Sequence, residues 1–411
     1  MPAAYRLQYS LPAAYRLQYS LPVQNGDKMR NDLRTYVTVN LDAIADNLRQ
    51  VRQKAGPGVK VMAVIKTDAY GHGAVAVSQY LYAKGLADWF AVASISEAIE
   101  LRQAGITLPI LILGYTMHAW YPAVVSYDIA QTIYSVEDAE LLSRTALSQG
   151  KKARVHIAVD TGMGRIGFMP DEAGAESVCR IADLAGIELE GMFTHFSTAD
   201  EADKTYTKLQ MERYDAFVTM LEEKGLVIPL KHVCNSAAIM EFDHHRYDMV
   251  RSGIITYGLY PSEEVCKDNM PLRPALEWKA HVVHVKTAGP GLGISYGKTF
   301  VTSAPETRIA TIGCGYGDGY PRALSGKGRV LIHGKSVPIL GRVCMDQFMV
   351  DVTGIDDVAV EDEVTLIGRD GDEMITVEEA AAMAGSFNYE FVCDIGQRAE
   401  RVYITDAEKQ R

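Results

Sequence analysis

Eight short apolar runs, separated by longer amphipathic segments, follow one another through the first two-thirds of the sequence. The segments between the runs, such as 95–103 and 206–224, carry apolar residues at helical spacing. Strands that alternate with helices eight times predict a TIM (β/α)8 barrel, although a doubly wound open sheet would give a similar pattern. The runs occupy residues 60–66, 89–94, 109–114, 129–134, 154–160, 187–196, 231–236 and 247–253.

Residues with chemically useful side chains stand at the C-terminal ends of these runs. Lys66 ends the first run, Arg165 follows the fifth, His195 belongs to the sixth, and Ser236 and Arg251 belong to the last two. In a barrel the C-terminal ends of all strands converge on one mouth, whereas an open sheet would spread them along an edge. This placement favours the barrel, with a functional site at its mouth.

The pattern changes at about residue 274, where short alternating strands broken by glycine and proline replace the barrel rhythm. We therefore expect the barrel over residues 42–273 and a mostly β domain over 274–411. An alternating strand at 35–41 precedes the barrel, and we expect it to join the β domain. Asp42 is expected to cap the helix that follows this strand.

An exact repeat stands at the start of the chain. Residues 2–11 recur without change at 12–21. A perfect tandem duplication without the apolar core of a secretory signal is more typical of a disordered or artificial leader than of a folding unit. We therefore leave residues 1–30 out of the fold.

The composition restricts the classes of function. A chain of 411 residues is long enough for two domains, each with its own core. The net charge of -11 argues against nucleic acid or an anionic membrane as a partner, since either would need a basic face. The six cysteines are scattered without metal-binding spacing, which predicts a cytoplasmic protein with reduced cysteines and no metal centre. Small-molecule chemistry is favoured.

The stretch AVIKTDAYGHG places Lys66 at the end of a buried strand and before a glycine-rich turn. Taken alone, this stretch favours a solvated lysine at the barrel mouth, because most lysines are exposed. The alternative is a lysine whose amine is bound covalently as a Schiff base, which removes the cost of burying its charge.

The sequence resembles the alanine racemase family from about residue 35 to its C-terminus. AVIKTDAYGHG is similar to the family's cofactor-lysine signature and VDTGMGRIGF to its fifth-strand motif, while SYGKTF, GCGYGDGYPR, GRVCMDQFMVDV and NYEFVCDI are similar to four motifs of its β domain. Six motifs in the same order are far more specific than any single one. The resemblance implies a homodimeric pyridoxal 5'-phosphate enzyme with active sites shared between subunits, which interconverts L-alanine and D-alanine and supplies D-alanine for peptidoglycan.

The resemblance also implies catalytic roles. Lys66 would hold the cofactor and act as one of two bases on the α-carbon, and Tyr296, from the partner subunit, would be the other. Arg251 would face the pyridine nitrogen and leave it unprotonated, because an arginine does not give up its proton under ordinary conditions. His195 would lie between the cofactor and Arg251 and help to tune Tyr296.

Further positions match the family's contacts with cofactor and substrate. In barrels, phosphate usually binds at backbone amides after the last strands and at a helix N-terminus. The substrate carboxylate is assigned to Arg165 and to the backbone amide of Met345, the latter again from the partner, while Tyr316 and Tyr389 would narrow the entrance. The remaining cofactor contacts are Tyr70, Asn235, Ser236, Gly253, Ile254 and Tyr389.

One position departs from the family. Many members carry a carbamylated lysine that holds the carboxylate-binding arginine, but the matching residue here is Ala158. What orients Arg165 is therefore left open by the sequence.

Three other functions stay open at this point. A serine-preferring or dual alanine/serine racemase is opposed by the retained Tyr389 and by the absence of a membrane domain. A decarboxylase of basic amino acids shares the architecture but places an acidic residue where this chain has Arg251. A pyridoxal-phosphate carrier without catalysis would leave the β domain, with Tyr296 and Met345, unexplained.

Overall fold

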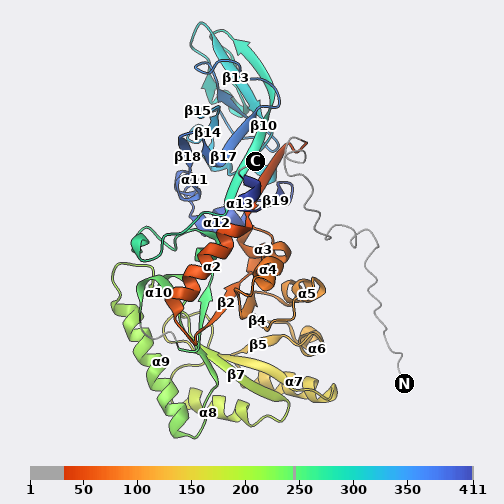
Figure 1. The fold of residues 1–411 in the computed structure, drawn as a ribbon, viewed down its shortest axis with the longest axis vertical. Helices are drawn as coiled ribbons and strands as arrows, with labels where there is room; N and C mark the ends of the chain where they lie inside the picture. The colour runs from red at the N-terminus through yellow and green to blue at the C-terminus, as the bar shows by residue number, and fades with distance from the viewer. Residues whose placement is uncertain (1–31, 244–246, 410–411) are drawn as a thin grey trace, which may run out of the picture.

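The computed structural model describes residues 32–243 and 247–409, which form two domains arranged end to end (Figure 1). The duplicated leader at 1–30 lies outside the described residues. No helix in the described ranges is both long and apolar enough to cross a membrane.

The first domain is a ring of parallel strands. In the described residues, eight strands lie in the order β8-β7-β6-β5-β4-β3-β2-β9. Hydrogen bonds from Asp248 N to Lys231 O (3.0 Å) and from Arg251 N to Cys234 O (2.9 Å) join the two outer edges. The predicted TIM barrel is confirmed. The strands are β2 Lys60–Val64, β3 Trp89–Val92, β4 Ile110–Ile112, β5 Ala130–Ile133, β6 Ala153–Ala158, β7 Ile187–Phe193, β8 Leu230–His232 and β9 Met249–Ser252.

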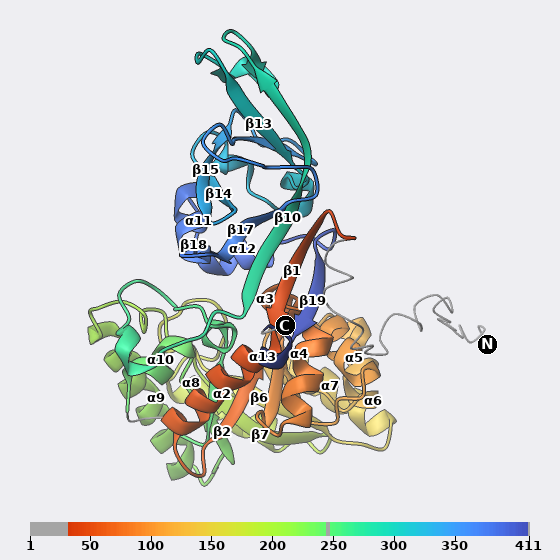
Figure 2. The same ribbon diagram turned by 45° about the horizontal axis from the view of Figure 1, so that its top comes forward.

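Helices surround the ring and cover its outer face (Figures 1 and 2). Strands β3 and β4 are buried at every position, which explains why they appear in the sequence as continuous apolar runs. The helices are α2 Leu41–Ala55, α3 Lys66–Tyr70, α4 Ala74–Ala83, α5 Ile95–Gln103, α6 Tyr121–Ser126, α7 Val136–Ser148, α8 Glu172–Ala182, α9 Thr205–Glu223 and α10 Ser236–Glu241, with 3-10 turns η2 His118–Trp120, η3 Ile254–Tyr257 and η4 Lys267–Asn269.

The cap of α2 differs from the prediction. The side chain of Asn40, not Asp42, accepts a hydrogen bond from Ala43 N (3.0 Å) and caps the helix. Strand β1 runs directly into α2, so the helix begins two residues earlier than the prediction placed it. The carboxylate of Asp42 instead accepts hydrogen bonds from the Tyr80 hydroxyl and from Asp406 N (3.0 Å).

The second domain contains a sheet with strand order β18-β17-β14-β15-β16-β13-β10-β1-β19. β1 lies between β10, where Thr35 is opposite Ala280, and β19, where Tyr36 is opposite Glu400. The first strand of the chain is therefore a strand of this sheet. The elements of the second domain are β1 Thr35–Asn40, β10 Leu276–Ala288, β11 Gly293–Ile294, β12 Phe300–Val301, β13 Thr307–Ile312, β14 Arg329–Ile332, β15 Lys335–Leu340, β16 Phe348–Asp351, β17 Glu363–Asp370, β18 Glu373–Ile375, β19 Glu400–Ile404, η5 Tyr296–Lys298, η6 Tyr316–Asp318, η7 Arg322–Leu324, α11 Val377–Ala384, α12 Asn388–Cys393 and α13 Asp406–Lys409.

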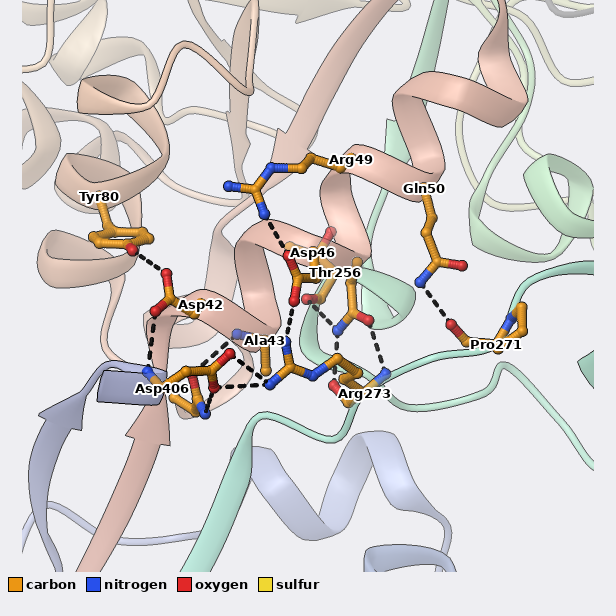
Figure 3. A network of polar contacts seen from close by, with 12 residues as sticks. Asp42, Ala43, Asp46, Arg49, Gln50, Tyr80, Thr256, Pro271, Arg273 and Asp406 are labelled. Carbon is orange, nitrogen blue, oxygen red and sulfur yellow. Dashed lines mark hydrogen bonds and ion pairs between the residues drawn. The ribbon is translucent and has the colours of Figure 1, made fainter. Parts of the chain in front are cut away.

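A polar network joins the two domains at α2 (Figure 3). Arg273, in the segment that links the barrel to β10, forms ion pairs with Asp46 of α2 and with Asp406 of α13 (2.8 Å to the latter). Asp42 connects the same network to the Tyr80 hydroxyl. Because these residues come from the barrel, the linker and the C-terminal end, the network fixes the orientation of the domains.

Candidate active site

The C-terminal end of β2 leads into a turn of left-handed backbone. The φ angles from Thr67 to Tyr70 are 54°, 51°, 54° and 53°. This conformation costs a residue other than glycine about 1–2 kcal/mol of free energy, so surrounding contacts must stabilise the turn. The turn begins at Lys66 and presents this residue at the mouth of the barrel.

Two carboxylates hold the turn in place. Glu97 Oε1 accepts a hydrogen bond from Thr67 N (2.7 Å), while its Oε2 accepts one from Ser94 N (3.0 Å) at the start of α5. Asp68 Oδ1 accepts a hydrogen bond from Ala74 N (2.6 Å). Glu97 thus ties the peptide that follows Lys66 to the end of the neighbouring strand.

The β domain of the same chain covers this turn. Arg401 Nε donates to Gly71 O (2.9 Å). A Cβ atom at Gly71, which has a φ of 78°, would lie 2.1 Å from Val392 O. Only glycine allows α12 to approach this closely, so the two domains share the floor of the site.

Lys66 is half-buried, and its surroundings disfavour the charged amine. Burial, followed by the positive charge of Arg165, lowers the pKa of Lys66 below its ordinary value, and the nearby Cys393 and Glu97 oppose this shift. A lysine with a lowered pKa has more neutral amine near neutral pH, which is the form that attacks a carbonyl or accepts a proton.

A space for an anion lies at the ends of β8 and β9. Gly253 N donates to Ser236 Oγ (3.0 Å). A Cβ atom at Gly253 would lie 2.9 Å from the Tyr70 hydroxyl and 3.3 Å from Ser236 Oγ, so glycine leaves this space open. Ile254, buried directly after it, begins η3. Hydroxyl groups and backbone amides at such a position suit a phosphate.

Aromatic rings line one side of this space. The ring of Tyr70 lies 5.1 Å from that of Tyr257 and 6.2 Å from that of Tyr389, which comes from α12 of the β domain. Asn235 lies beside the same space as the N-cap of α10, and its Oδ1 accepts a hydrogen bond from Ala238 N (3.0 Å). A contact between Asn235 and a cofactor stays a prediction.

Arg251 lies in β9 and is almost fully buried. Its Nη2 donates to Thr194 O (2.8 Å) and lies 3.5 Å from His195 Nδ1. Burial lowers the pKa of Arg251 to about 10, which still leaves it positively charged at neutral pH. Burial, followed by the charge of Arg251, lowers the pKa of His195 to about 3. A cation beside a neutral imidazole is therefore fixed in the barrel.

Arg165 follows β6 and contributes a second positive charge. This charge is among the causes that lower the pKa of His195, after burial and Arg251. Ala158, the last residue of β6, is 2% exposed and has no charge with which to orient Arg165. In the part of the chain that the structure describes, Arg165 forms no ion pair. The carboxylate-binding role of Arg165 stays a prediction.

The predicted residues of the β domain form a second group. Tyr296, Tyr316 and Met345 are 69%, 41% and 52% exposed. Ser295 Oγ donates to Arg342 O (2.6 Å), and backbone hydrogen bonds join the loop of Tyr316 to that of Met345. The structure thus brings these three loops together on one exposed surface.

The site residues at the barrel mouth and the exposed group in the β domain are far apart within one chain. Tyr296 lies in the segment that joins β10 to β13, and this segment is at the end of the β domain farthest from the barrel (Figures 1 and 2). Lys66 lies at the opposite end of that domain, beneath α12. One chain therefore does not bring Tyr296 to Lys66.

Sequence reasoning missed several residues of the site. Glu97 had a recognisable signal, because Ser94 and Glu97 form the capping-box pattern of a helix start. His232, which contacts Arg251, had no signal beyond its place at a strand end. Tyr257, whose hydroxyl donates to Val64 O (2.7 Å), had none.

His72, in the turn after Lys66, is fully buried. Its Nδ1 lies 3.1 Å and 2.9 Å from the carbonyl oxygens of Ala69 and Tyr70, so this nitrogen carries the proton. Burial lowers the pKa of His72 to about 4. Because the pKa of His72 is lower in the folded state than in the unfolded state, the contribution of neutral His72 to stability is fully present above about pH 6.5. This contribution is lost as the pH falls towards 4.

We expect His72→Asn to reduce the acid sensitivity of folding. Asparagine keeps a donor near the two carbonyl groups but does not titrate, whereas protonating His72 costs on the order of 3 kcal/mol when the pKa falls from 6.5 to about 4. The thermal midpoint should fall less in the variant than in the wild type between about pH 7 and about pH 4.5. His284→Asn, at an exposed histidine, is the control, and parallel curves for His72→Asn and wild type would contradict the assignment.

The fold and the site define a class: a two-domain barrel protein that brings a lysine, a buried arginine and several hydroxyl groups together at the C-terminal ends of its strands. Residues 39–261 match the alanine racemase N-terminal domain and residues 275–403 the alanine racemase C-terminal domain. The chain belongs to the alanine racemase family.

Individual relatives agree with this assignment. The chain is 49% identical to an alanine racemase of Clostridium perfringens, over 90% of this chain and 95% of the relative, and 48% identical to one of Desulforamulus reducens, over 90% and 98%. A solved structure of an alanine racemase from Clostridium difficile 630 superposes with a TM-score of 0.87 at 45% identity, covering 91% of this chain and 96% of the other.

Proposed function

We propose that the chain is an alanine racemase that interconverts L-alanine and D-alanine with pyridoxal 5'-phosphate as cofactor. The observation that carries the proposal is the position of Lys66, at the mouth of the same barrel that holds Arg251 and the space beside Gly253. The family assignment and the names of the relatives support it.

The residues of the barrel suit this cofactor. Ser236, Gly253 and Tyr70 surround a space that a Cβ atom would fill, and we assign the phosphate to it. Lys66 has the lowered pKa that attachment to an aldehyde requires. Arg251, a permanent donor at neutral pH, would hold the pyridine nitrogen as an acceptor.

When bound, the cofactor stabilises negative charge on the α-carbon of the attached amino acid. The protein must then remove a proton from one face of that carbon and return one to the other. The Lys66 amine serves one face, and the Tyr296 hydroxyl of the partner subunit serves the other. Because either group can act first, one site handles both enantiomers. Arg165 binds the substrate carboxylate.

We propose a homodimer in which each barrel receives Tyr296 and Met345 from the other chain. The support is twofold: these side chains are exposed, and the segment that carries Tyr296 lies far from Lys66 in the same chain (Figures 1 and 2). Placed over the barrel of a partner, Tyr296, Tyr316 and Met345 would complete the site. We also assign the protein to the cytoplasm and to the supply of D-alanine for peptidoglycan, and its scattered cysteines suit a reducing compartment.

The decisive measurement is the inversion of L-alanine and L-serine in parallel, followed by chiral chromatography with kcat/KM for each. We expect L-alanine to be preferred, with serine turned over less well by up to about 100-fold, because packing alone rejects an added hydroxyl poorly. A preference for serine would indicate the serine racemase alternative. Inversion of neither substrate would indicate a carrier, and release of CO2 a decarboxylase.

A mixed dimer tests the shared site. We expect Lys66→Ala and Tyr296→Phe homodimers to be nearly inactive, whereas the heterodimer should recover activity at one of its two sites. In that heterodimer, one site carries both substitutions and the other carries neither. Purification through two different affinity tags followed by a racemisation assay checks this. A heterodimer as inactive as its parents would contradict the exchange of Tyr296 between chains.

A further inference from the structure

Arg251 has an unusual environment for a buried cation. Among the described residues its hydrogen-bond partners are carbonyl oxygens and imidazole nitrogens, without a carboxylate. A buried charge is normally paired, because isolation in a low-dielectric interior is costly. The counter-charge of Arg251 must therefore be sought beyond its direct contacts.

A chain of polar side chains leads from Arg251 across the barrel interior. Arg251 Nη1 lies 2.9 Å from His232 Nδ1, and His232 Nε2 lies 2.9 Å from His156 Nδ1. His156 Nε2 lies 3.5 Å from Glu190 Oε2, and Glu190 Oε1 lies 3.6 Å from Arg154 Nη1. Both histidines are fully buried, and the first three contacts join the cofactor-facing arginine to Glu190, an acidic residue of β7.

The direction of every hydrogen bond in this chain follows from its first member. A guanidinium group only donates, so His232 Nδ1 must accept and His232 must be neutral with its proton on Nε2. That proton points to His156 Nδ1, so His156 is also neutral and carries its proton on Nε2. The Nε2 proton of His156 therefore points to Glu190, whose carboxylate only accepts hydrogen bonds.

The far end of the chain has no alternative partner. Within the described residues, His156 Nε2 and Glu190 Oε2 are buried atoms without a hydrogen-bond partner, and they face each other in an ion-pair contact at 3.5 Å. A buried polar atom needs a hydrogen-bond partner, and we infer that each of these two atoms is the partner of the other. Burial lowers the pKa of His156 and lowers that of His232 further, which agrees with two neutral rings.

The packing leaves the two rings no freedom to turn. The His232 ring stacks on Phe193 at an interplanar angle of 14°, and the edge of Trp89 meets the His156 ring at 64°. A Cβ atom at Gly191 would lie 2.4 Å from His156 Nδ1, so a glycine in β7 is needed to admit the ring. These contacts make the chain a fixed part of the barrel.

We propose that Glu190 is a positioning residue that acts on Arg251 through His156 and His232. Its carboxylate accepts the Nε2 proton of His156 and so stabilises the protonation pattern that Arg251 requires, in which His232 presents a lone pair to Arg251 and holds the guanidinium in one orientation. The chain also links Arg251, which has no carboxylate among its direct contacts, to the carboxylate of Glu190, which itself lies 3.6 Å from Arg154. The consequence for catalysis rests on the proposed function, but the direction of the hydrogen bonds does not.

Neutron diffraction from deuterated crystals of the wild-type holoenzyme tests the direction. We expect deuterium on Nε2 and none on Nδ1 in both His156 and His232. Deuterium on Nδ1 of either ring would overturn the proposal. This measurement needs no activity, so it remains decisive even if the enzyme does not racemise alanine.

Matched variants test the positioning role. Glu190→Leu removes the acceptor, Glu190→Gln keeps an acceptor without charge, and Glu188→Leu, at an exposed residue of the same strand, is the control. Outer partners of this kind typically contribute about 10–100-fold to activity, so we expect kcat to fall in that range for Glu190→Leu with little change in KM. Glu190→Gln should recover part of the loss, and the control should match wild type. A wild-type kcat in Glu190→Leu would overturn the role.

Discussion

Replacing Lys66 by alanine is expected to abolish racemisation and the covalent attachment of the cofactor together. A single general base contributes up to about 10⁴-fold, and Lys66 also holds the cofactor, so the loss should exceed that factor. The absorption spectrum and chiral analysis of product from either enantiomer measure the two losses separately.

The matched control is Lys60→Ala, because Lys60 begins the same strand at its exposed end. This variant should bind the cofactor and racemise alanine as the wild type does. A Lys66→Ala enzyme that kept the spectrum of a lysine-bound cofactor would show that another lysine carries it, and the assignment of the barrel site would then be wrong.

Tyr296→Phe is expected to separate binding from catalysis. The variant should retain the cofactor on Lys66, because Tyr296 belongs to the β domain and not to the barrel that carries Lys66. Loss of the phenol should lower kcat by about 10²–10⁴-fold, the range for one acid or base. Deuterium exchange at the α-carbon should persist from the enantiomer that Lys66 deprotonates and be lost from the other.

Tyr82→Phe, at another exposed tyrosine, on α4, is the control and should be fully active. If Tyr296→Phe racemised both enantiomers at the wild-type rate, Tyr296 would not be a base. The two-base mechanism would then need a different group on that face.

The sequence predicted the barrel because its signal is local. Each buried strand is a short apolar run, and each helix has its own periodicity, as in α5. The motifs around Lys66 and Arg251 are contiguous as well, so strand-end positions could be assigned from them. The structure confirms the fold, and the catalytic roles remain predictions for the experiments above.

What the sequence could not predict depends on contacts between distant segments. The link from Arg251 through His232 and His156 to Glu190 joins four strands, and no spacing along the chain encodes it. The left-handed turn after Lys66 is similar, because residues such as Thr67 do not favour positive φ and are held by Glu97. The prediction also placed the cap of α2 at Asp42 instead of Asn40, because β1 and the helix share a boundary that only the sheet defines.

The position of β1 has a consequence for synthesis on the ribosome. Thr35 pairs with Ala280 and Tyr36 with Glu400, so β1 waits for partners that are synthesised much later than itself. Such pairing gives a high contact order and slow closure of the sheet, whereas the barrel can form from neighbouring segments as they emerge. Nascent chains should therefore expose an unpaired β1 edge until β19 has emerged, and truncation before β19 should leave a species that aggregates or recruits chaperones.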